Sequence, residues 1–154
     1  VLAGLAEHGE IPAGFVKHLL EVREVLAPAY AREAVRHAPG RVAAFLARAE
    51  GLGASASEWS AFDWELHRLL AIASGNPVYV LILNGFRELF ARMALLYFER
   101  PAARQASRAF YEALRAAAAA GDAPRAENVT RGVMTRSVAL WKPLEKRLAE
   151  EMTP

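Results

Sequence analysis

The sequence contains no cysteine among its 154 residues, which excludes disulfide bonds, thiolate metal sites and thiol redox chemistry. Long apolar runs are also absent. The longest, among them residues 78–83 and 93–98, are six residues each, far short of the roughly 20 needed to cross a bilayer. Nothing at the start resembles a signal peptide. We therefore expect a cytoplasmic protein that does not enter a membrane.

Sequence motifs for enzyme chemistry are missing as well. The chain has no P-loop, no GxGxxG fingerprint, no nucleophile elbow and no Ser-His-Asp order. Lysine is scarce, with 3 residues against 16 arginines, and these cations are scattered along a chain of net charge +2. A nucleic-acid surface would be clustered. We therefore expect neither an enzyme nor direct contact of this chain with DNA.

The composition predicts an all-α fold. Alanine supplies 33 residues, whereas valine, isoleucine and threonine together supply only 17, and alanine is the best helix former. Breaks rich in glycine, proline or aspartate separate the expected helices, and short connections favour antiparallel neighbours. The prediction is an antiparallel bundle of six to seven helices, at residues 12–37, 41–52, 57–73, 77–100, 102–120 and 123–151.

Three prolines bear on this prediction. Pro77 is a good first helical residue, and the apolar stripe that follows it predicts one helix of about 22 residues, the central rod of the bundle. Pro28 and Pro143 fall inside other helical patterns, and each is expected to kink its helix or split it.

Asp63 and His67 lie four residues apart and hence on one face of a predicted helix. The pair could be half of a metal site, an acid/base pair or a structural hydrogen bond, and a catalytic zinc would need at least three protein ligands. Arg23, Asn84 and Arg92, like Asp63, lie among apolar neighbours on helices expected to be central. A bundle interior with convergent polar groups is a candidate ligand cavity.

The segment from Asp63 to His67, continued by Ala73-Ser74-Gly75-Asn76-Pro77, resembles the ligand-binding domain of GntR-superfamily bacterial transcription regulators, specifically the FadR branch. The resemblance extends over nearly the whole chain. It implies that residues 1–154 form an effector-binding and dimerisation domain that follows a winged helix-turn-helix DNA-binding domain, which is absent from this chain. It also implies a homodimer that releases DNA on binding long-chain acyl-CoA, with no other cofactor, and a role in fatty acid metabolism.

The resemblance further implies a set of ligand-binding residues. Those matching the lining of the acyl tunnel are Leu20, Arg23, His67 and Tyr97, and those near the thioester and coenzyme A are Arg131, Ser137 and Trp141. His67 replaces a phenyl ring of the branch, and Val133 and Met134 replace a tyrosine and a glycine. With Asp63 and Asn84, Met134 is expected to belong to the pocket.

The alternative hypothesis is a domain that senses a small organic acid through a bound metal ion. Many members of the wider superfamily hold a metal ion with the Asp and His of this motif and two further histidines, and sense small organic acids. The positions matching those histidines are Ser107 and Ser137, and a hydroxyl is a poor replacement for imidazole toward a transition metal. Asp63 and His67 therefore resemble the remnant of a metal site.

Overall fold

The computed structural model describes residues 14–151, apart from the side chains of residues 148, 149 and 151. Within this range the chain forms seven α-helices, one short 3-10 helix and no strand, which confirms the predicted all-α class. The elements are α2 (Phe15–His37), α3 (Pro39–Ala47), η1 (Arg48–Gly51), α4 (Ala56–Ala73), α5 (Pro77–Gly85), α6 (Arg87–Phe98), α7 (Pro101–Ala119) and α8 (Ala123–Glu151). None of these helices is long and apolar enough to cross a bilayer.

Local chemistry explains where the helices begin and end. Helices α3, α5 and α7 each have a proline in their first turn, where its missing N–H costs no helical hydrogen bond. Before α5, the side chain of Asn76 accepts a hydrogen bond from the Val78 amide at 3.1 Å. Gly75 and Gly121 adopt φ of 79° and 63°, a left-handed conformation that glycine reaches without steric cost.

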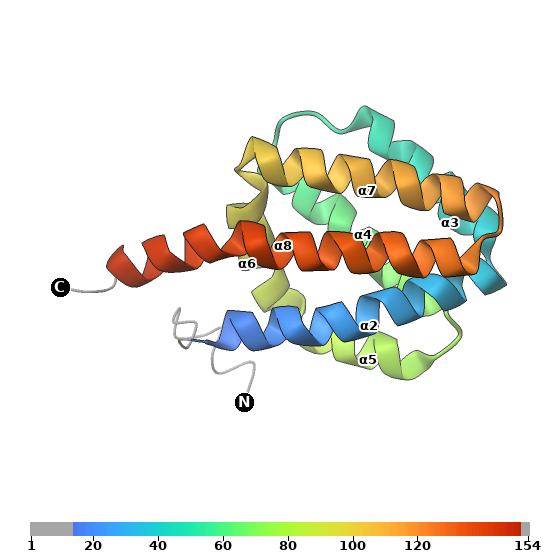
Figure 1. Ribbon diagram of the computed structural model, residues 1–154, viewed down its shortest axis with the longest axis horizontal. Helices are drawn as coiled ribbons and strands as arrows, with labels where there is room; N and C mark the ends of the chain where they lie inside the picture. The colour runs from blue at the N-terminus through green and yellow to red at the C-terminus, as the bar shows by residue number, and fades with distance from the viewer. Residues whose placement is uncertain (1–13, 152–154) are drawn as a thin grey trace.

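The helices pack as an antiparallel bundle. Figure 1 shows α8 lying between α7 and α2 and running antiparallel to both, and both pairs are in contact. Helix α3 packs on α7, and α4 packs against α2, α5 and α6. The larger apolar core is centred on fully buried side chains such as Trp59, Leu66, Leu70 and Leu114. A smaller core joins α2, α6 and α8, and its buried members are Val16, Leu19, Leu20, Met93, Trp141 and Leu144.

The predicted single helix over residues 77–100 is wrong. The chain turns at Phe86, whose φ of −101° and ψ of −1° end α5 and begin α6. Helix α5 packs mainly on α4, whereas α6 packs on α4, α7 and α8. Helices α5 and α6 each have an apolar face. The apolar pattern of the sequence therefore continues past Phe86 although the helix does not. Asn84 and Arg92 are both exposed, contrary to their predicted place among buried neighbours.

The two internal prolines do not split their helices. Helix α2 continues through Pro28 and α8 through Pro143, and Figure 1 shows α8 as one long rod. The predicted helix over residues 41–52 differs in another way, because the structure divides it into α3 and the 3-10 helix η1. The predicted start at Pro12 lies outside the described residues, and the other predicted outer ends agree with the structure within two residues.

The cap at the start of α5 gives a stability prediction. Asn76→Ala removes the acceptor of the Val78 amide and should lower the free energy of unfolding by about 1 kcal/mol in urea denaturation. The matched control is Asn84→Ala, the same substitution at an exposed position inside α5, which should change stability by less than about 0.5 kcal/mol. Equal losses in the two variants would contradict the capping role.

Candidate ligand-binding cavity

A cavity opens inside the bundle between α2, α4, α6, α7 and α8. Its empty volume is about 540 Å³, including the part open to solvent. Most of its wall is apolar, with a few polar side chains. The lining residues are Leu20, Arg23, Asp63, Phe90, Met93, Ala94, Tyr97, Phe98, Ser107, Phe110, Val133, Met134, Ser137 and Trp141.

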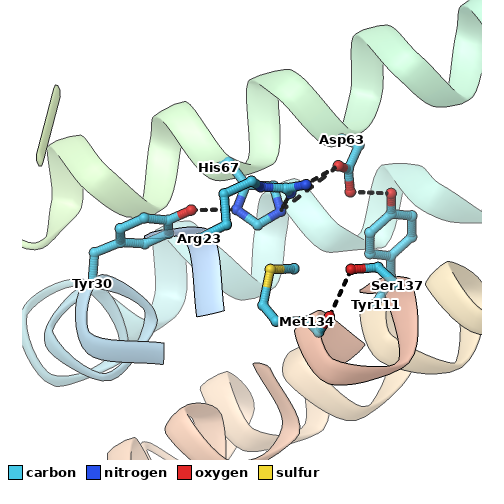
Figure 2. Close-up of polar contacts among 7 residues, drawn as sticks. All are labelled: Arg23, Tyr30, Asp63, His67, Tyr111, Met134 and Ser137. Carbon is cyan, nitrogen blue, oxygen red and sulfur yellow. Dashed lines mark hydrogen bonds and ion pairs between the residues drawn. The ribbon is translucent and has the colours of Figure 1, made fainter. Parts of the chain in front are cut away.

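One wall of the cavity is a buried polar cluster centred on Asp63 (Figure 2). The Tyr111 hydroxyl donates a hydrogen bond of 2.7 Å to Asp63 Oδ1. Arg23 Nη2 lies 4.0 Å from Asp63 Oδ2 and 3.4 Å from His67 Nε2. The Arg23 guanidinium also stacks on the Phe90 ring, 5.1 Å from its centroid. Side chains from α2, α4, α6 and α7 thus meet around the Arg23–Asp63 pair.

His67 is neutral in this cluster. Arginine can only donate, so the contact from Arg23 Nη2 to His67 Nε2 requires an unprotonated Nε2. The ring proton then lies on Nδ1, which is 2.5 Å from the Tyr30 hydroxyl. Burial lowers the pKa of His67 to about 4, the Asp63 carboxylate opposes this shift, and Arg23 adds to it. The 3.7 Å approach of His67 to Asp63 is therefore no ion pair at neutral pH.

Three tyrosines around the cavity keep their protons for a related reason. Burial is the largest cause that raises the pKa of Tyr30, Tyr97 and Tyr111, and the charge of Asp63 adds to it in each case. The pKa of Tyr97 reaches about 12. These groups are neutral hydroxyls that can donate hydrogen bonds.

Two of the polar atoms in the cavity wall are buried without a partner. The Tyr97 hydroxyl and Trp141 Nε1 make no hydrogen bond to any described protein group, and both residues line the cavity. Leaving a buried donor unsatisfied costs about 1–3 kcal/mol, and native proteins rarely accept that cost without a function. Both atoms are suited to hydrogen-bond an oxygen of a bound molecule.

The structure brings most of the sequence-predicted site residues together. Seven of them line the cavity: Leu20, Arg23, Asp63, Tyr97, Met134, Ser137 and Trp141. His67 lies behind Arg23 within hydrogen-bond distance of it. Ser137 donates to the Met134 carbonyl at 2.7 Å, which leaves its oxygen able to accept.

Two predicted residues lie elsewhere. Asn84 is exposed on α5 and does not line the cavity, because the turn at Phe86 separates α5 from α6. Arg131 is exposed on α8 and bonds Glu127 at 2.9 Å, outside the lining set. Tyr30 and Tyr111 were missed by sequence reasoning. Only folding brings these isolated tyrosines to the Asp63–His67 pair, and no local sequence pattern predicts these contacts.

The residues around Asp63 and His67 do not fit a divalent metal ion. The Arg23 guanidinium lies next to both of the oxygen and nitrogen atoms that would hold the ion, so it already supplies the positive charge. Among the described residues no group of three or more His, Cys, Asp or Glu could hold a metal ion. Ser107 and Ser137 line the same cavity but offer only hydroxyl groups.

The fold and the cavity together define an all-α domain built around a small-molecule pocket. A protein-family model described as the FadR C-terminal domain matches residues 2–153. The chain therefore belongs to the FadR C-terminal domain family.

Curated relatives support the same assignment. The "Fatty acid metabolism regulator protein" of Edwardsiella ictaluri is 34% identical over 146 residues, which are 95% of this chain and 61% of the relative. Its namesake in Shewanella amazonensis is 37% identical over 147 residues, 92% of this chain and 60% of the relative. That of Yersinia pestis is 40% identical over 108 residues, 70% of this chain and 45% of the relative. The chain thus spans about three-fifths of the first two relatives.

The pKa of His67 predicts how stability depends on pH. This pKa is about 4 in the folded protein and about 6.5 in the unfolded chain, so the unfolded state takes up the proton first as the pH falls. The contribution of His67 is fully present above pH ~6.5 and is lost between pH ~6.5 and ~4, by at most about 3 kcal/mol. Urea unfolding from pH 7.5 to 4.5 should show this decline.

A comparison of variants isolates the histidine. His67→Phe should lack this part of the pH dependence, whereas His37→Gln, a change at a half-exposed histidine on the surface of α2, should keep it. If His67→Phe and the wild type lose stability in parallel as the pH falls, the neutral assignment of His67 is wrong.

Proposed function

We propose that this domain is the effector-binding part of a bacterial transcription regulator of fatty acid metabolism and that its effector is a long-chain acyl-CoA. The observation that carries the proposal is the cavity itself, an apolar interior with two unpartnered donors, the Tyr97 hydroxyl and Trp141 Nε1. An acyl chain suits the apolar lining, and its thioester carbonyl suits the donors. Buried methylenes contribute roughly 0.8 kcal/mol each, so chain length alone can select the effector.

The proposed seat of the acyl group is between α2, α6 and α8. Leu20, Met93 and Trp141 meet there in the smaller apolar core, and all three line the cavity. Coenzyme A is hydrophilic and would remain at the surface, where Arg131 is exposed on α8. Arg131 is the proposed contact for that part of the ligand.

The regulatory step would act through α8. This helix carries Met134, Ser137 and Trp141 on the cavity wall and packs along α2. A ligand shifts a two-state equilibrium only by binding one state more tightly. In the proposal, the acyl-CoA favours an arrangement of α8 and α2 that is incompatible with DNA binding.

The remaining parts of the proposal concern the whole regulator. The chain covers about three-fifths of the first two relatives, and we propose that a winged helix-turn-helix domain preceding it makes the contact with DNA. The regulator would act as a cytoplasmic homodimer, the common arrangement for symmetric DNA sites.

Calorimetric titration with palmitoyl-CoA, beside free coenzyme A and palmitate, tests the effector. We expect saturable binding of palmitoyl-CoA and no saturable binding of coenzyme A alone. Trp141→Phe keeps most of the apolar surface but removes the indole donor, and should weaken palmitoyl-CoA about threefold to tenfold. Trp64→Phe is the matched control outside the cavity lining and should leave the affinity unchanged. Saturable binding of a small organic acid instead of the thioester would refute the acyl-CoA assignment.

Met134 gives a separate prediction about chain length. Its side chain is buried and lines the cavity, where a flexible thioether occupies space that an acyl chain could use. Met134→Ala should move the preferred acyl-CoA toward longer chains in titrations from eight to sixteen carbons, with each added methylene gaining up to roughly 0.8 kcal/mol. An unchanged length preference would show that Met134 does not limit the tail.

A further inference from the structure

Arg23 and Asp63 are the only charged side chains among the described residues that line the cavity. They carry opposite charges, and their side chains are 15% and 11% exposed. His67 contributes no charge, because its Nε2 accepts from Arg23. The cavity wall is therefore electrically balanced, with one positive group and one negative group.

Asp63 is held in this position. Its Oδ1 accepts from the Tyr111 hydroxyl and its Oδ2 faces Arg23 and His67, as Figure 2 shows. The carboxylate therefore cannot turn away from the cavity without breaking a buried hydrogen bond. The carboxylate is therefore a fixed part of the wall that an entering ligand meets.

The unpartnered donors in the same cavity carry no charge. The Tyr97 hydroxyl and Trp141 Nε1 can each bind an acceptor oxygen without requiring it to be ionised. A neutral carbonyl would satisfy them and leave the Arg23–Asp63 balance intact. A carboxylate would bring an extra negative charge into a partly dehydrated space that already holds Asp63, and such a charge is costly unless something pairs it.

We propose that Asp63 sets the charge specificity of the cavity: by balancing Arg23 it admits neutral acyl compounds such as thioesters, esters and amides and discriminates against free carboxylic acids. The inference rests on the proposed function. It deepens that function by naming the residue that makes the cavity bind a neutral acyl derivative in preference to the corresponding acid. Asp63 acts here as a specificity-determining residue and needs no contact with the acyl chain.

Two further arginines lie near the Tyr97 side of the cavity. The charges of Arg100 and Arg136 act on the Tyr97 hydroxyl more weakly than those of Asp63 and Arg23. Arg136 is exposed, and one Arg100 nitrogen donates to the Leu140 carbonyl at 2.6 Å. Neither lines the cavity, and water screens the charge of the exposed Arg136. The balance inside the cavity thus depends on Arg23 and Asp63.

The test compares octanamide with octanoate, two ligands of the same length and shape that differ in charge. Amide NMR titrations at pH 7.5 measure both dissociation constants. The wild type should bind octanamide at least several-fold more tightly than octanoate. Asp63→Asn keeps an acceptor for Tyr111 but leaves Arg23 unbalanced, so it should shift the amide-to-acid preference toward octanoate by about tenfold or more.

Two further variants keep the result interpretable. Glu65→Gln makes the same change in charge at an exposed residue of α4 and should leave the preference of the wild type unchanged. Arg23→Gln leaves Asp63 unbalanced and should shift the preference about tenfold or more in the opposite direction, toward octanamide. This opposite shift remains decisive if Asp63→Asn fails to fold, as judged by circular dichroism.

The outcomes separate the inference from the function on which it rests. A wild type that prefers octanoate, or variants at positions 23 and 63 that keep its ratio while palmitoyl-CoA still binds, would overturn the role of Asp63 alone. A wild type that binds neither eight-carbon probe nor palmitoyl-CoA would overturn both the inference and the proposed function.

Discussion

The charge of Arg23 is the constraint on which the interior of this domain depends. A guanidinium cannot give up its proton inside a protein, so a buried arginine needs a fixed counter-charge. Asp63 supplies that charge from α4, and Tyr111 of α7 holds Asp63 in place. This requirement ties α2, α4 and α7 together at one point.

The cavity follows from the way the remaining helices meet this polar wall. Helices α6 and α8 contribute mainly apolar and aromatic side chains, among them Phe90, Tyr97, Met134 and Trp141. Hydrogen bonds and an ion pair fix the side chains of the polar wall. The Met134 side chain, in contrast, is unbranched and flexible. The cavity thus has one wall that sets polarity and another that can adapt to the shape of a ligand.

The Asp63–His67 pair shows what residue spacing can predict and what it cannot. Four-residue spacing placed the two side chains on one helix face, as the structure shows, but it left a metal site, an acid/base pair and a hydrogen bond open. The structure decides among these because Arg23 reaches both side chains from α2 and Tyr30 reaches His67. These partners lie 44 and 37 residues away from His67 in the chain, beyond the reach of any local pattern.

The sequence by itself determined the all-α class and most helix ends, and its family resemblance named half of the residues that line the cavity. Alanine content, prolines at first turns and the glycines at 75 and 121 act within a few residues, so their effects can be read locally. Only the tertiary structure decided that the apolar stripe after Pro77 bends at Phe86 and that Asn84 and Arg131 lie outside the cavity. It also decided that Arg23 neutralises Asp63. The direction of a helix and the pairing of a buried charge depend on contacts between distant segments, which form only when the bundle closes.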